Sequence, residues 1–264
     1  MEPLFFLPVY ALVGLVAGTA AGLLGVGGGL IIVPALAVLF HYFGIDEHRM
    51  QLAVGTSLAT IAVTAITSVI AHQKQGAIQW TVFWRLSPGV MFGAIAGAYL
   101  ASQLPSELLK VAFGLIEIAV ALQIMRQLKP KQLRQLPGDL TLGAVGSVIG
   151  FISAVVGIGG GTLTVPYLVW CNTAIQKAIA TSAACGLPIA LAGSLAYVVF
   201  GYQQGVTVAG ASGFVYWPAF FGIVVTSMLA APYGARLTHR LPTKQLSKVF
   251  AWFLLFVGVS MLIS

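Results

Sequence analysis

The chain has 264 residues, of which 59% are hydrophobic and only 7% are charged, with a mean hydropathy of +0.98 and a formal net charge of +7. A soluble domain carries about 25% charged residues, so this composition excludes an ordinary soluble protein. The Lys and Arg residues stand at the ends of apolar segments, where the positive-inside rule accounts for them. The positive charge therefore does not indicate a nucleic-acid partner.

Ten apolar segments fill nearly the whole chain, and a helix of about 20 apolar residues suffices to span the hydrocarbon of a bilayer. In chain order they are residues 4–24, 30–43, 51–71, 80–101, 107–126, 140–156, 162–171, 177–200, 212–235 and 243–263. They lack the alternation of polar and apolar residues that is typical of a membrane β-barrel. The sequence therefore predicts an all-α polytopic membrane protein embedded in the lipid bilayer.

Two short stretches share one glycine-rich pattern, GVGGGLIIVPAL at 25–36 and GIGGGTLTVPYL at 157–168. Seven of their twelve residues are identical. Further matches follow in the same order along the chain. They pair Gly14 with Gly146, Gly18 with Gly150, Gly55-Thr56-Ser57 with Ala180-Thr181-Ser182, and Trp80 with Trp217. The chain is therefore predicted to be a duplication.

We divide the chain into a first membrane repeat at 1–126, a basic cytoplasmic linker at 127–139 and a second membrane repeat at 140–264. If each glycine-rich element crosses the membrane once, the Lys and Arg residues divide six to seven between the two sides. If each is a re-entrant hairpin, eleven share one side and only Arg49 and Lys110 lie opposite. Because cytoplasmic loops are enriched in Lys and Arg, the second topology is favoured. It predicts two inverted repeats, each a re-entrant broken-helix hairpin plus three transmembrane helices, with both termini external.

The glycine clusters predict a break in the helix inside the membrane, where irregular backbone is tolerated only within protein or beside a water-filled cavity. The residue before a proline prefers an extended conformation, and proline favours the first position of a helix. We therefore expect a break at 25–33 followed by a helix that begins near Pro34, and a second helix that begins near Pro166. A branched side chain at Gly28 or Gly160 is expected to fill the gap and to oppose positive φ.

In this arrangement two helix N-termini would face each other near the membrane midplane. Helix N-termini attract anions through free N–H groups and the helix dipole. Inverted repeats with broken helices that meet at the midplane are how many secondary transporters build a substrate site.

Two copies of GxGGGxxxxPxL in a chain of this length and hydropathy resemble the TauE/SafE family of sulfite and organosulfonate permeases. The resemblance covers essentially the full chain. It implies a protein of the cytoplasmic membrane of a prokaryote that moves a small inorganic or organic sulfur anion, such as sulfite, thiosulfate or an organosulfonate. The motif residues carried over are Gly25, Gly27, Gly28, Gly29, Pro34, Gly157, Gly159, Gly160, Gly161 and Pro166.

Hydroxyl side chains add candidates for the substrate site, because a small oxyanion needs O–H and N–H donors. They are Thr56, Ser57, Thr162, Thr181 and Ser182. Serine and threonine also bond to the carbonyls of their own helix, so both roles stay open. Thr162 and Thr164 stand where the first copy has Leu30 and Ile32, which concentrates polarity in the second copy.

Glu117 is the only acidic residue deep within an apolar segment, which makes it a functional candidate by default. It either carries a coupled proton or is neutral and bonded to a neighbouring helix. Arg49 and Lys177 precede the two Thr-Ser pairs, as topology determinants or as attractors of anions. Cys185 is either a small packing residue or a contact for thiosulfate.

We interpret the chain as a secondary transporter that works by alternating access around a midplane site, with no cofactor and no metal. An intramembrane enzyme would need paired carboxylates, a histidine cluster or a nucleophile with a base, and Glu117 stands alone. We therefore expect no enzymatic activity. An anion channel or a non-transporting membrane subunit is the alternative, because a glycine-lined midplane site would serve a channel too.

Overall fold

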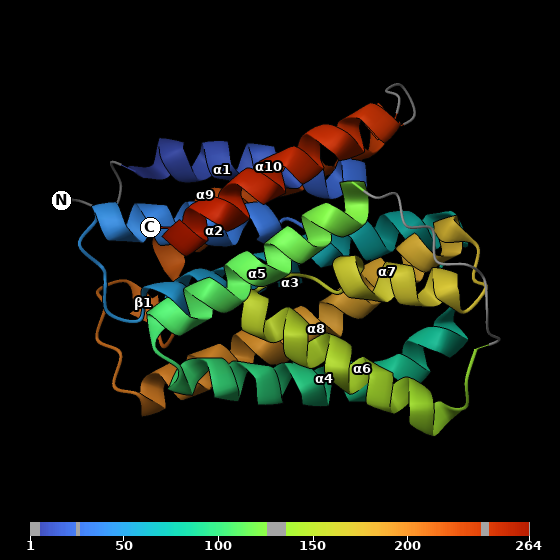
Figure 1. Ribbon diagram of the computed structural model, residues 1–264, viewed down its shortest axis with the longest axis horizontal. Coiled ribbons are helices and arrows are strands. Elements are labelled where there is room, and N and C mark those ends of the chain that lie inside the picture. Colours follow the sequence, from blue (N-terminus) through green and yellow to red (C-terminus); the bar gives the residue numbers. More distant parts are fainter. Residues whose placement is uncertain (1–5, 25–26, 126–135, 239–242, 264) are drawn as a thin grey trace.

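The computed structural model describes residues 6–24, 27–125, 136–238 and 243–263, in which ten helices pack along the long dimension of the molecule (Figure 1). We refer to residues 6–125 as the first half and to residues 136–263 as the second half. The helices of the first half are α1 (Leu7–Leu24), α2 (Gly29–Tyr42), α3 (Arg49–Lys74), α4 (Trp80–Gln103) and α5 (Ser106–Met125). Those of the second half are α6 (Asp139–Val156), α7 (Gly161–Trp170), α8 (Ile175–Gln203), α9 (Trp217–Thr238) and α10 (Thr243–Ile263).

A short antiparallel ribbon, β1 (Ala211–Ser212) and β2 (Val215–Tyr216), precedes α9. The prediction of an apolar span that starts at residue 212 is therefore wrong. Gly210 and Gly213 have φ angles of +83° and +55°, which turn the chain and are incompatible with a right-handed helix. The helix consequently begins only at Trp217.

Four helices, α3, α5, α6 and α8, are long and apolar enough to cross a membrane, and α1, α2, α9 and α10 contain shorter apolar stretches. Large apolar side chains point outward from the bundle, among them Leu140, Phe256 and Phe92, which are 92%, 74% and 70% exposed. Soluble proteins rarely expose extended apolar surface, whereas the hydrocarbon of a bilayer accepts it. The prediction of an all-helical polytopic membrane protein is confirmed.

Two helix pairs begin at opposite ends of the molecule and return to the end from which they came (Figure 1). α1 runs from the left end toward the right, and α2 starts near the middle and returns to the left. α6 runs from the right end to the middle, and α7 returns to the right. With 14 and 10 residues, α2 and α7 are too short to cross about 30 Å of hydrocarbon at about 1.5 Å per residue.

The helix contacts of one half recur in the other with the halves exchanged. α1 packs along α9, and its counterpart α6 packs along α4. α2 lies on α3 as α7 lies on α8, and the pairs α3–α8 and α5–α10 join the halves. Glycines bring these backbones together: an added Cβ at Gly14 or Gly18 would overlap α9 at Thr226 or Ser227, and one at Gly150 would overlap Val90 of α4. Such close approach through small residues is typical of helix packing in membranes.

Candidate functional site

The two glycine motifs contact each other through their backbones in the middle of the molecule. A Cβ added to Gly29 would overlap the carbonyl oxygen of Gly157 and lie 2.9 Å from the Cα of Ile158. One added to Gly27 would lie 3.6 Å from the Cα and the nitrogen of Gly159. Residues 128 and 132 positions apart therefore approach each other closely through their backbones, and the absence of a side chain on glycine permits it.

Each motif contains a helix break, but the breaks are shorter than the sequence predicts. α2 begins at Gly29 and α7 at Gly161, so the prediction of helices that begin near Pro34 and Pro166 is wrong. Each proline is the sixth residue of its helix, where it removes an N–H and leaves the carbonyl four residues earlier without that donor. The β-branched residues before the prolines are helical because packing in a buried setting overrides their weak propensity.

Left-handed backbone occurs at Gly27 and Gly157, with φ of +77° and +73°. Gly28 and Gly160 instead have φ of −73° and −56° and cap the N-termini of α2 and α7. The expectation of positive φ at Gly28 and Gly160 is therefore wrong. The chain reverses one residue before the cap in the first motif and directly after α6 in the second.

The N-terminal ends of α2 and α7 flank the contact between the motifs and leave it in opposite directions (Figure 1). The first N–H groups of a helix have no carbonyl partner within it, and they carry the positive end of the helix dipole. Gly28, Gly29 and Gly160 are buried at this place. Such an arrangement offers N–H donors and positive potential to a small anion in a water-poor setting.

The paired threonines Thr56 and Thr181 join the two halves. The Oγ1 of Thr56 accepts a hydrogen bond of 2.9 Å from the backbone N–H of Tyr216, directly before α9. The Oγ1 of Thr181 accepts one of 3.0 Å from the N–H of Gln79, directly before α4. Both hydroxyls thus accept hydrogen bonds from the opposite half of the chain.

The paired serines differ from each other. Ser57 donates a hydrogen bond of 2.9 Å to the carbonyl of Gly157, which fastens α3 to the second glycine motif. Ser182 is fully buried, and its hydroxyl has no partner in the part of the chain that the structure describes. Ser182 is one of four residues in the second half whose buried hydroxyl has no hydrogen-bond partner among the described residues. The other three are Ser153, Thr162 and Thr164.

Glu117 lies fully buried on α5, the helix that packs against α10. Neither of its carboxyl oxygens has a hydrogen-bond partner among the described residues, so the expected bond to a neighbouring helix is not seen. α5 and α10 approach closely nearby, since a Cβ on Gly114 would lie 2.9 Å from the carbonyl oxygen of Gly258. Glu117 is three residues, about one helical turn, beyond this close approach.

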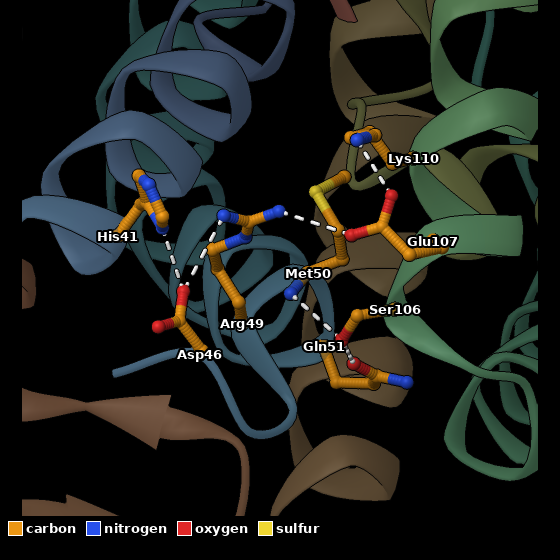
Figure 2. Close-up of polar contacts among 8 residues, drawn as sticks. All are labelled: His41, Asp46, Arg49, Met50, Gln51, Ser106, Glu107 and Lys110. Carbon is orange, nitrogen blue, oxygen red and sulfur yellow. Dashed lines mark hydrogen bonds and ion pairs between the residues drawn. The ribbon is translucent and has the colours of Figure 1, made fainter. Parts of the chain in front are cut away.

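Arg49 and Lys110, the two basic residues assigned to the sparse side, are both paired with acids (Figure 2). The guanidinium of Arg49 lies 3.2 Å from Glu107 and 3.5 Å from Asp46, and the ammonium of Lys110 lies 2.6 Å from Glu107. A hydrogen bond from His41 holds the pKa of the Asp46 carboxyl below its ordinary value. With its charge balanced in this way, Arg49 is a poor attractor of free anions.

Lys177 is exposed at the start of α8, where it remains available to either role. Cys185 is fully buried in an apolar cluster that includes Leu86, Leu142 and Leu168. Apolar packing accounts for the position of this thiol.

Gln51 fixes the α4–α5 connection to the start of α3 (Figure 2). Its Nε2 donates to the carbonyl of Leu104 at 2.6 Å, and its Oε1 accepts from Ser106 at 2.7 Å, with the side chain 1% exposed.

We expect Gln51→Leu to lower the free energy of unfolding by about 1–3 kcal/mol, because buried partners lose their bonds. Thermal unfolding in detergent measures this, with the exposed Gln103→Leu as the control expected to stay within about 0.5 kcal/mol. Equal effects of the two variants would contradict the assignment.

An all-helical bundle with an apolar outer surface and two broken-helix motifs that meet inside it defines a polytopic membrane protein. The family model described as sulfite exporter TauE/SafE matches residues 10–261, so the chain belongs to the TauE/SafE family. It is a membrane transporter of that family.

Similar proteins carry matching descriptions. A "probable membrane transporter protein" of Haemophilus influenzae is 34% identical over 258 residues, which cover 97% of this chain and 98% of that protein. A protein of the same description from Methanocaldococcus jannaschii is 26% identical over 99% of this chain and 97% of its own. The Bacillus subtilis protein YunE, also described as a probable membrane transporter, is 26% identical over 96% of each chain. No solved structure gave a significant match.

Proposed function

We propose that this protein is a secondary transporter that moves a small sulfur-containing anion, such as sulfite, thiosulfate or an organosulfonate, across the cytoplasmic membrane of a prokaryote. The substrate binds where the two glycine motifs meet. This proposal rests on the backbone contacts of Gly29 with Gly157 and of Gly27 with Gly159, beside the N-termini of α2 and α7. Free N–H groups at two converging helix ends suit an anion.

The substrate shell in this proposal combines both motifs with nearby hydroxyls. Its residues are Gly25, Gly27, Gly28, Gly29, Pro34, Thr56, Ser57, Gly157, Gly159, Gly160, Gly161, Thr162, Pro166, Thr181 and Ser182. Gly25 lies outside the described residues, so its place is inferred from the repeat. Thr56, Ser57 and Thr181 add the bonds that hold the two halves around the site.

Alternating access follows from an inverted repeat, with residues 1–126 and 140–264 as the two copies. The exchanged helix contacts and the two hairpins that open toward opposite ends support this architecture. In such transporters one repeat rocks against the other around a fixed site. During such a movement, the hydrogen bonds of Thr56, Ser57 and Thr181 between the halves must either break or move together with their partners.

The test is flux in proteoliposomes with sulfite, thiosulfate, sulfoacetate, sulfate and chloride. A secondary transporter gives saturable sulfite flux, and sulfite on the far side of the membrane accelerates it by exchange. A channel gives flux that neither saturates at low concentration nor shows exchange. Absence of flux for every anion in the panel would favour a non-transporting subunit and overturn the proposal.

The topology makes a separate prediction. If both glycine motifs are re-entrant, residue 132 lies in the cytoplasm and the C-terminus lies outside. The asymmetric distribution of Lys and Arg, eleven against two, gives the physical reason. Reporter fusions after residue 132 and at the C-terminus measure it. A C-terminal reporter located in the cytoplasm would contradict the inverted, re-entrant arrangement.

A further inference from the structure

We propose that the hydroxyls of Thr164 and Ser182 are the specificity-determining donors of the anion site and that they select an oxyanion over a halide. The inference rests on the proposed function and deepens it. It places the donors that distinguish an oxyanion from a halide in the second half, on α7 and α8.

Both hydroxyls are buried and unused. Thr164 and Ser182 are each 0% exposed, and neither side-chain oxygen has a hydrogen-bond partner among the residues that the structure describes. Leaving a buried hydroxyl unpaired destabilises a protein, so two such hydroxyls on neighbouring helices require an explanation. A ligand that accepts both O–H groups supplies one.

The two hydroxyls stand at the same level on facing helices. α7 packs on α8, and the two run in opposite directions (Figure 1). A Cβ on Gly160 would lie 3.7 Å from the nitrogen of Gly186, which fixes the register of the pair. One helical turn onward from Gly160 is Thr164, and one turn back from Gly186 is Ser182.

Thr164 is also directed toward the N-terminus of α7. Its Oγ1 lies 3.1 Å from the position that a Cβ on Gly160, the N-cap residue, would occupy. The hydroxyl therefore lies beside the first turn of α7, where the Cδ1 of Ile189 would also lie 2.9 Å from that added Cβ. An anion there would accept from the helix end and from a side chain together.

The two matching side chains in the first half offer no free hydroxyl donor. Ile32 stands at the position of Thr164, and its Cδ1 lies 3.1 Å from a Cβ built on Gly28. Ser57 stands at the position of Ser182, and it donates to the carbonyl of Gly157. In the first half, one of the two matching side chains is apolar and the other is already hydrogen-bonded. In the second half, α7 and α8 each contribute one unpaired hydroxyl.

This geometry favours an anion with several oxygens that point in different directions. Sulfite or a sulfonate can present one oxygen to Thr164, one to Ser182 and one to the N–H groups of α7. A chloride ion is a single acceptor and cannot reach all three sets of donors equally well. Selectivity for oxyanions follows from the separation of the donors.

The test uses Thr164→Val and Ser182→Ala in the full-length protein, with sulfite as the probe and chloride as the competitor. We expect each variant to raise the sulfite concentration for half-maximal flux by about tenfold or more, since hydrogen bonds to a charged group are strong. The chloride concentration that halves sulfite flux should fall in parallel. Thr164→Ser, which keeps the hydroxyl, should restore most of the sulfite affinity.

A stability measurement separates recognition from a structural role. In the absence of anion, Thr164→Val should unfold at the same or a higher temperature than the wild type, because it removes an unpaired buried hydroxyl. Thr60→Val is the matched control, since Thr60 is equally buried and its hydroxyl donates to the carbonyl of Thr56 at 2.9 Å. This control should leave sulfite affinity unchanged.

The outcomes are distinguishable. If the wild type shows no saturable sulfite flux, the proposed function fails and this inference fails with it. If the wild type transports sulfite but Thr164→Val and Ser182→Ala behave as Thr60→Val does, only the inference is overturned. Reduced sulfite affinity with undiminished stability supports it.

Discussion

Gly29→Ala is expected to abolish transport, whereas Gly28→Ala is expected to leave most of it. The Cβ of an alanine at position 29 would overlap the carbonyl oxygen of Gly157, and backbone cannot move aside as a side chain can. At position 28 the nearest atoms are the Cδ1 of Ile32 at 3.1 Å and the Cβ of Ala17 at 3.3 Å. Overpacking costs about 1–3 kcal/mol even where side chains yield, and more is expected at position 29.

Sulfite flux per inserted protein measures the difference between the two alanine variants. Size-exclusion chromatography and thermal unfolding in detergent show whether each variant still folds. A Gly29→Ala variant with the flux and the unfolding temperature of the wild type would show that the two glycine motifs are not in contact.

Glu117→Gln is expected to abolish accumulation driven by a proton gradient while leaving exchange of sulfite across the membrane intact. A carboxyl group that is fully buried and has no described partner can take up and release a proton as access alternates. Glutamine keeps the shape but carries no exchangeable charge. Transport that needs no net proton movement therefore continues.

The matched control is Glu107→Gln, in the ion-paired cluster at the start of α5, which should preserve both activities (Figure 2). The measurements are accumulation under an imposed pH gradient and exchange without one. Undiminished accumulation in Glu117→Gln would assign this residue to structure alone.

Hydropathy alone predicts where most helices lie. The predicted segment 51–71 falls within α3 (Arg49–Lys74), and 80–101 falls within α4 (Trp80–Gln103). Long apolar runs have few alternatives in a bilayer, because every backbone polar group must be bonded. The positions of these helices therefore depend little on tertiary detail.

The starts of α2 and α7 were not predictable in the same way. Local rules for proline favour a helix that begins at Pro34, yet α2 begins at Gly29. The deciding contact is between Gly29 and Gly157, which are far apart in the sequence. Local propensities cannot register such a contact.

The repeat pairs Thr56-Ser57 with Thr181-Ser182, but it does not predict which residues these side chains bond. Thr56 bonds to Tyr216 and Ser57 to Gly157, residues 160 and 100 positions away. Neither helical spacing nor composition reveals these partners. Ser153, a further buried hydroxyl without a described partner, carries no motif signal at all.

The most direct test of the central claim is a cryo-electron microscopy structure of the protein with selenite, a heavier analogue of sulfite. We expect density for the anion between the N-termini of α2 and α7, beside Gly27–Gly29 and Gly159–Gly161. Density should disappear in an anion-free sample. Selenite bound elsewhere in a protein that transports sulfite, with the space between the two motifs empty, would contradict the account.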